Sequence, residues 1–89
     1  GDLAVALALV SSLKDKPISD KTIVFGEIGL AGELRNVTQV ETRIREAERL
    51  GFEKCILPYH SLSRLTCRFD KIQLVGAKDV KQAFEAALE

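Results

Sequence analysis

One stretch, residues 22–51, constrains the fold more than any other part of the chain; it reads TIVFGEIGLAGELRNVTQVETRIREAERLG. It begins with a β-branched and aromatic run over residues 23–25, which favours a strand. Three glycines at three-residue spacing follow, and glycine accepts backbone conformations that other residues avoid. This part therefore predicts a strand, a bulged hairpin turn and a second strand. The glycines are Gly26, Gly29 and Gly32.

The second half of the stretch predicts an amphipathic helix. Thr38 and Glu41 have the spacing of a capping box, and Gly51 stands where a helix would end. Charged residues occupy the remaining face, with Glu41 and Arg45 spaced as a surface i, i+4 pair. The apolar stripe expected to face the core consists of Val40, Ile44, Ala47 and Leu50.

The rest of the chain supplies further helices and strands. Asp2 can cap a helix over residues 3–13, which Pro17 prevents from continuing. Asp79 with Gln82 caps a last helix. The segments expected between them are a strand at residues 54–57, a helical turn at 59–65, a strand at 72–75 and a turn at 76–78. The predicted order is α-β-β-α-β-(short α)-β-α, an α/β fold with at least one parallel pair, residues 54–57 beside 72–75.

Length and composition predict one globular domain over residues 1–89. The chain is 46% apolar and 29% charged with a formal net charge of zero, so no field of one sign steers it to nucleic acid or to a membrane. The two cysteines form no CxxC motif, which indicates reduced thiols in a cytoplasmic protein. The longest apolar run, residues 3–10, is too short to span a bilayer. A first residue of glycine and the lack of methionine suggest a fragment of a longer protein.

The segment GEIGLAGELRNVTQVETRIREAERLGF, preceded by DLAVALALVSSLKDKPI, resembles the C-terminal Lon-protease-like domain of the RadA (Sms) family of bacterial DNA-repair proteins. The resemblance covers essentially all 89 residues. It implies the α/β fold shared by Lon protease domains and the second domain of ribosomal protein S5, with this chain covering the C-terminal portion. Further strands would precede the first helix, so one face of that helix would need a partner.

Lon-type peptidases use a serine–lysine dyad, in which the lysine takes the proton of the attacking serine. Matched without a gap from the hairpin, the lysine position falls on Glu41, and a carboxylate cannot replace the ammonium there. The serine position lies upstream of Gly1 or at the break itself. Ser11 and Ser12 are poor substitutes because they lie inside the predicted first helix. We therefore expect no catalytic residues and no enzyme activity in this chain.

Other candidate residues have simpler structural explanations. His60 is expected to cap or decorate the turn at residues 58–61. Cys55 and Cys67 are expected to be buried or half-buried small residues rather than metal ligands. The glycine spacing lacks the lysine–serine/threonine ending of a phosphate loop and leads into a strand, so no ATP site is expected. Glu27 and Glu33 are interpreted as hairpin residues rather than as paired catalytic carboxylates.

Nucleic-acid contact is the remaining candidate function of the residues themselves. Glutamates alternate with arginines on the predicted helix, so the pattern alone favours a solvated face of mixed charge. Arginine nevertheless suits phosphate contact. The candidate DNA or subunit-interface residues are Lys14, Lys16, Arg35, Arg43, Arg45 and Arg49.

The resemblance implies a parent protein that is a DNA-dependent ATPase acting on branched DNA in recombinational repair (branch migration). In such a protein this domain supports oligomerisation, possibly as a hexameric ring, and DNA binding. ATP, magnesium and zinc would be bound outside this chain, which would hold no cofactor or metal and contact no membrane. Two alternatives remain: a diverged Lon-family Ser-Lys peptidase fragment, or an interaction module of an unrelated multidomain protein.

Overall fold

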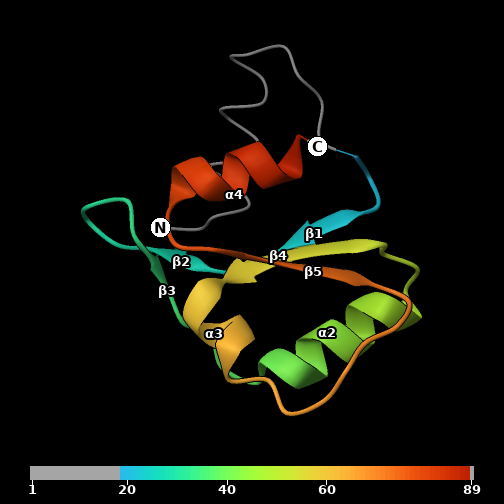
Figure 1. Cartoon of the computed structure of the whole chain (residues 1–89). Helices are drawn as coiled ribbons and strands as arrows, with labels where there is room; N and C mark the ends of the chain where they lie inside the picture. Colours follow the sequence, from blue (N-terminus) through green and yellow to red (C-terminus); the bar gives the residue numbers. More distant parts are fainter. Residues whose placement is uncertain (1–18, 89) are drawn as a thin grey trace.

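Three parallel strands form the main sheet, in the order β1-β4-β5 (Figure 1). They are β1 (Thr22–Val24), β4 (Lys54–Pro58) and β5 (Gln73–Ala77), in a computed structural model that describes residues 19–88. Four of the five residues of the central strand β4 are buried, as expected for a parallel strand covered on both faces. The predicted parallel pair is confirmed. The turn expected at residues 76–78 is wrong for its first two residues, which extend β5 along β4.

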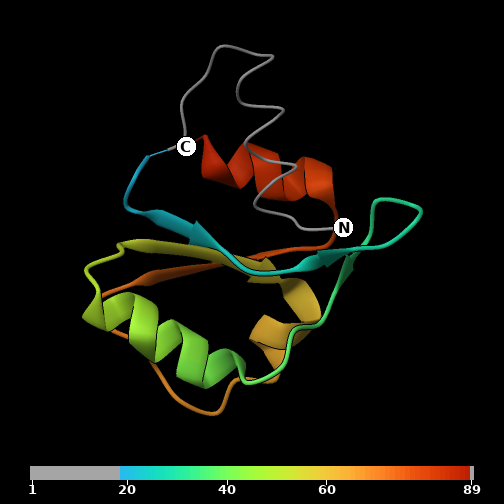
Figure 2. The same cartoon turned by 180° about the vertical axis from the view of Figure 1, so that it is seen from behind.

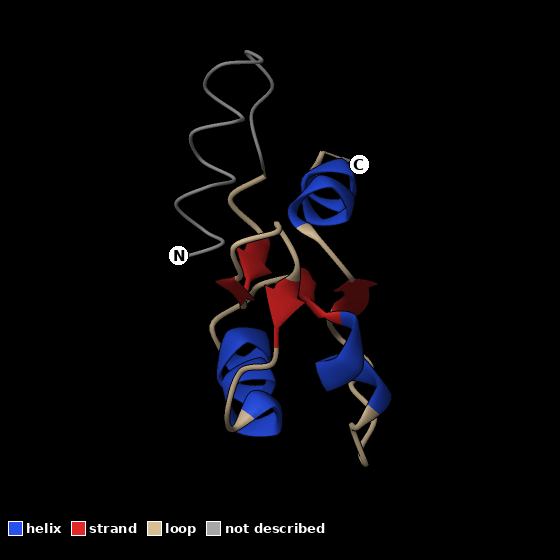
Figure 3. Cartoon of the chain, turned by 90° about the vertical axis from the view of Figure 1, so that its left-hand side faces the viewer, coloured by secondary structure: helices blue, strands red, loops and turns tan. Residues whose placement is uncertain are grey.

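Helices cover the two faces of this sheet unequally. α2 (Val40–Arg49) and α3 (Tyr59–Ser63) lie on one side, and α4 (Val80–Ala87) lies on the other (Figure 3). Along β4 the side chains alternate between two buried clusters: Ile56 packs with α4, whereas Cys55 and Leu57 pack with α2. The described part is therefore a three-layer α/β arrangement with β4 at its centre, which confirms the α/β class.

The hairpin differs from the prediction. The antiparallel pair is β2 (Glu27–Ile28) with β3 (Leu34–Arg35), and β1 pairs with β4 instead of with the strand that follows it. β1 is an edge strand whose apolar residues become half-buried by pairing with β4, and beyond its end the Phe25 amide still donates to the Ile56 carbonyl at 2.8 Å. Figure 2 shows the β2–β3 hairpin projecting beyond the sheet. The chain therefore forms one strand more than expected before α2.

The N-terminus of α2 corrects a second expectation. The capping box of Thr38 and Glu41 is not formed: Gln39 is the N-cap, with φ 54°, and no side chain caps the helix. At the other end the helix stops as expected, with Gly51 at φ 96°. Leu50 was expected in the apolar stripe but is 60% exposed, because it follows the last helical turn.

The start of α4 agrees with its prediction. The Asp79 carboxylate accepts a hydrogen bond from the Gln82 amide at 2.8 Å, and the Gln82 side chain accepts one from the Lys78 amide at 2.9 Å. Three alanines of this helix, Ala83, Ala86 and Ala87, are buried.

Several expectations fall outside the described residues. These are the helix at residues 3–13, its end at Pro17, the two serines at positions 11 and 12, and the cations Lys14 and Lys16. Within residues 19–88, no helix has the length and apolar character needed to cross a membrane.

Candidate nucleic-acid interface

The carboxyl ends of the three parallel strands meet at one edge of the sheet, which is where open α/β sheets commonly bind ligands. Phe25 follows β1, Tyr59 follows β4 and Lys78 follows β5. Two cation–aromatic pairs form there: the Arg43 guanidinium carbon lies 5.9 Å from the Phe25 ring centroid, and Lys78 Nζ lies 5.1 Å from that of Tyr59. We refer to the edge defined by Phe25, Arg43, Tyr59 and Lys78 as the carboxyl edge.

Two cavities flank the segment that leads from β3 to α2. One of about 510 Å³ is lined by residues that include Phe25, Thr38 and Arg43, and one of about 290 Å³ lies between α2 and α3. Asn36 borders both cavities, and the buried Ser61 hydroxyl donates to its side-chain oxygen at 3.1 Å. This bond joins α3 to the segment after the hairpin, so Asn36, which lines both cavities, is held in place.

The four predicted arginines that the structure describes do not form one cluster. Arg43 Nε donates to the Thr38 carbonyl at 3.1 Å while its guanidinium covers Phe25. Arg45 donates to Cys67 Sγ at 3.8 Å, and its charge adds to the hydrogen bonds from Cys67 and Thr66 in lowering the pKa of Glu41, its predicted partner. Arg49 forms an ion pair with Glu46, with Nε donating to Oε2 at 3.1 Å.

Arg35 has a different environment. It is exposed on the hairpin strand β3, opposite Glu27, and its guanidinium makes no hydrogen bond to any residue between 19 and 88. Of the candidate arginines, Arg43 lies at the carboxyl edge, and Arg35 follows Leu34, whose amide donates to the Lys78 carbonyl. Arg45 is engaged with Cys67 and Arg49 with Glu46.

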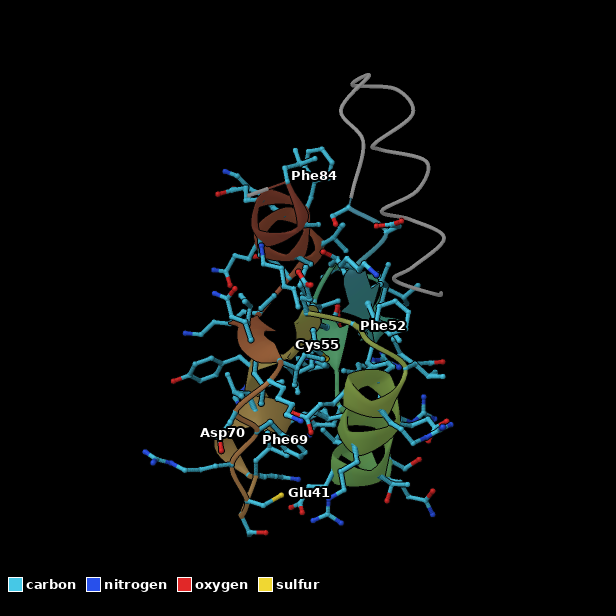
Figure 4. The ribbon with its side chains drawn as sticks, turned by 90° about the vertical axis from the view of Figure 1, so that its right-hand side faces the viewer. Glu41, Phe52, Cys55, Phe69, Asp70 and Phe84 are labelled. Carbon is cyan, nitrogen blue, oxygen red and sulfur yellow. The ribbon has the colours of Figure 1, made fainter. Side chains whose placement is uncertain are left out.

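Glu41, which was predicted to occupy the Lon lysine position, is held by the segment between α3 and β5. Its carboxylate accepts hydrogen bonds from the Thr66 amide at 3.3 Å, the Thr66 hydroxyl at 2.9 Å and the Cys67 thiol at 3.2 Å. Figure 4 shows Glu41 between α2 and this segment. The hydrogen bonds from Cys67 and Thr66 lower the pKa of Glu41, so the side chain is a stabilised carboxylate.

The remaining candidates behave as structural residues. Glu33 accepts a hydrogen bond from the Ala31 amide at 2.9 Å and so closes the hairpin turn, and Glu27 lies in β2, which confirms both as hairpin residues. His60 lies in α3 with its ring 5.9 Å from that of Tyr59, edge to face. Cys55 is buried as predicted, and burial raises its pKa to about 12.

Cys67 has the predicted degree of burial and in addition makes polar contacts. It is half-buried, and its hydrogen bond to Glu41 is the main reason that its pKa is raised. Both cysteines are unpaired, and no three histidine, cysteine or acidic residues of the described chain are grouped so as to hold a metal ion.

Sequence reasoning missed the pairing of Tyr59 with Lys78. Part of the signal was present, because Tyr59 and Lys78 lie two and three residues after the predicted strands at 54–57 and 72–75, and the two strands were expected to be parallel neighbours. Applying the rule that parallel strands end at one edge would have placed the aromatic ring and the cation together.

Comparison with known proteins gives the family. Residues 2–61 match the family model described as subunit ChlI of Mg-chelatase. The chain is also similar to "DNA repair protein RadA" of Streptococcus pneumoniae (43% identical over 94% of this chain), Listeria monocytogenes (38% over 98%) and Escherichia coli (42% over 92%).

These matches cover only part of each relative. The chain spans 17 to 20% of the length of these three curated relatives, so it corresponds to about a fifth of each. The resemblance of the chain to RadA proteins is confirmed over nearly its whole length. Because the family model covers more than half of the chain, the chain belongs to the family described as subunit ChlI of Mg-chelatase.

Proposed function

We propose that this chain is a non-proteolytic, Lon-like module of a RadA-type DNA-repair protein, which supports subunit assembly and contacts DNA. The fold would be that of Lon protease domains and the second domain of ribosomal protein S5. The ATPase activity that drives branch migration, with its ATP, magnesium and zinc, would belong to other parts of a cytoplasmic parent protein. Support for a role in DNA repair comes from the RadA relatives, which are 38 to 46% identical.

The observation that carries the non-proteolytic part of the proposal is the environment of Glu41. Among residues 19–88, the hydrogen bonds to its carboxylate come from Thr66 and Cys67, 25 and 26 residues away, and they favour the charged form. A serine nucleophile needs a base whose pKa lies near the working pH, so that it can take the proton. A carboxylate with a lowered pKa at the lysine position cannot act in that way.

A peptidase assay tests this part directly. We expect the full-length protein to leave casein and a fluorogenic peptide uncleaved, with Glu41→Gln behaving in the same way. Cleavage by the wild type that Glu41→Gln abolishes would support the alternative of a diverged peptidase.

DNA contact is tested by the salt dependence of binding in the full-length protein. Arg35→Ala and Arg43→Ala should weaken DNA binding, and each should reduce the slope of log K against log salt by roughly 0.7 to 0.9 if it removes one phosphate contact. Arg49→Ala is the matched control, because that side chain is already paired with Glu46.

Oligomeric state must be measured for the same variants. If Arg35→Ala binds DNA as the wild type does, or loses binding only because the assembly dissociates, the role in DNA contact is wrong and the module serves assembly alone.

Assembly has an independent structural argument in the hairpin tip. Leu30 is fully exposed between β2 and β3, and the turn that carries it is fixed by the bond from the Ala31 amide to Glu33. An exposed leucine on a rigid projection suits a protein contact. Leu30→Ser should therefore lower the oligomeric mass in analytical ultracentrifugation without unfolding the protein, and an unchanged mass would exclude this contact.

A further inference from the structure

We propose that Tyr59 is a stacking platform for one base of single-stranded DNA, with Lys78 contacting the adjoining phosphate. This inference rests on the proposed contact with DNA and assigns it to a particular place on the carboxyl edge. It adds two residues that were not among the sequence candidates.

Tyr59 stands out by its exposure and its chemistry. The structure describes three large apolar side chains that are strongly exposed, and Tyr59, at 45%, is the aromatic one among them; the other two are leucines. Every nucleobase has a π face, so an exposed ring can stack on any base, which a leucine cannot do in the same way. An aromatic ring beside a cation is the combination found on surfaces that bind single strands.

The ring is held in a defined position before any ligand arrives. Tyr59 opens α3 and packs on Gly76 of β5, where an added Cβ would lie 3.2 Å from the Tyr59 Cα and 3.3 Å from a ring carbon. The His60 ring supports it edge-on, at an interplanar angle of 79°. Little ordering is therefore needed on binding, which favours affinity.

Lys78 is fixed by its backbone in the same way. Its amide donates to the Gln82 side chain at 2.9 Å, and its carbonyl accepts from the Leu34 amide at 3.0 Å. The second bond ties Lys78 to the hairpin strand that carries Arg35, so both cations belong to connected elements. The neighbouring carboxylate of Asp79 accepts the hydrogen bond that caps α4. A DNA strand laid along the carboxyl edge would thus meet Lys78 and Tyr59 on rigid supports, with Arg35 on the β-strand bonded to Lys78.

The geometry favours a single strand over a duplex. In a duplex the bases are already stacked on each other, so a surface ring reaches a base face only where the strand is open or unpaired. Binding at Tyr59 should therefore be stronger for an unstructured strand, such as a deoxythymidine oligonucleotide, than for a duplex of the same length.

The sequence offers a direct probe of this contact. The chain contains one tyrosine and no tryptophan, so its intrinsic fluorescence reports Tyr59 alone. Titration of the 89-residue chain with a deoxythymidine 20-mer should quench this fluorescence, and the matching duplex should quench it much less. Binding measured by oligonucleotide anisotropy without any quenching would overturn the stacking contact.

Substitutions separate the ring from the charge. Tyr59→Leu should weaken binding of the labelled 20-mer by about tenfold and leave the salt slope unchanged, whereas Tyr59→Phe should bind as the wild type does. Lys78→Ala should reduce the salt slope by roughly 0.7, and Lys81→Ala on α4 is its matched control. Circular dichroism should be used to check that each variant is folded. Leucine is chosen at position 59 because it retains bulk against Gly76.

The outcomes distinguish this inference from the function on which it rests. One outcome is that the chain binds single-stranded DNA, that Arg35→Ala weakens this binding, and that Tyr59→Leu and Tyr59→Phe both bind normally. In that case the stacking platform is wrong and the proposed DNA contact stands. If the wild-type chain and the full-length protein bind no DNA, both proposals are wrong.

Discussion

At the scale of single residues, Glu41 shows how a helix side chain can hold a distant segment in place. Its carboxylate joins α2 to the segment before β5 by accepting from Thr66 and Cys67. The same contact perturbs both partners, because it lowers the pKa of Glu41 and raises the pKa of Cys67. The two shifts have one physical cause, since the thiol proton is shared with a negative acceptor.

Removing this acceptor should change stability in a pH-dependent way. The folded state lowers the pKa of Glu41 below its ordinary value of 4.5, so its contribution is complete above about pH 4.5 and is lost as pH falls through the folded-state pKa. We expect Glu41→Ala to be less stable than the wild type at pH 7, with the difference shrinking at pH 3. Urea denaturation at both pH values measures this, and Glu27→Ala serves as the surface control. A difference that is equal at both pH values would contradict the prediction.

The two thiols should also differ in reactivity. Cys55 is fully buried with a pKa raised to about 12, so it should resist iodoacetamide until the chain unfolds. Cys67 should be alkylated faster in Glu41→Ala than in the wild type, because the carboxylate that raises its pKa is gone. Mass spectrometry of labelled peptides gives both rates at pH 8. Rapid labelling of Cys55 in the native chain would show that β4 is not protected as described.

At the scale of elements, the helix ends separate local signals from distant ones. α4 begins as its sequence predicts, with Asp79 accepting from the Gln82 amide, because both groups belong to one helical turn. α2 has the same kind of signal, yet its first turn has no side-chain cap, because Glu41 is drawn to the distant Thr66. A capping motif therefore predicts a cap only where no stronger acceptor role competes for its residues.

Alanine substitutions at the two helix ends should reveal this difference. Asp79→Ala should destabilise the fold by about 1 kcal/mol, the usual cost of losing an N-cap. Thr38→Ala should cost much less, since its hydroxyl does not cap α2. Thermal or urea unfolding of the two variants compares them directly. Equal losses would mean that Thr38 caps the helix in solution after all.

At the scale of the whole molecule, β4 is the element on which both halves of the core depend. Ile56 belongs to the cluster under α4, and Leu57 belongs to the cluster under α2, with neither exposed to solvent. β4 also pairs with both β1 and β5, so neither cluster can separate without breaking the sheet. The described core is small, and each cluster alone would bury too little apolar surface to be stable.

Core truncations on β4 should therefore have similar and large effects. Ile56→Ala and Leu57→Ala should each cost about 2 to 5 kcal/mol, which is a large share of the stability of a domain this small. Urea unfolding followed by circular dichroism should show one transition for each variant. Two separate transitions would show that the clusters unfold independently.

The sequence by itself determined the features that depend on neighbouring residues. The end of α2 at Gly51, the Asp79 cap, a strand near residues 54–57 and its parallel partner near 72–75 all follow from local pattern and turn chemistry. Glycine spacing also located a hairpin, although it did not show which strands form it. These features were predictable because the groups that stabilise them lie within a few residues of each other.

Only the tertiary structure decided which distant groups meet. β1 joins β4 instead of forming a hairpin, Glu41 binds the segment before β5, and Tyr59 meets Lys78 at the carboxyl edge. Each contact brings together residues from 19 to more than 30 positions apart, and its energy depends on burial and geometry that no short pattern contains. The candidate DNA-contacting edge is the result, because parallel strands place the residues that follow them side by side whatever their distance in sequence.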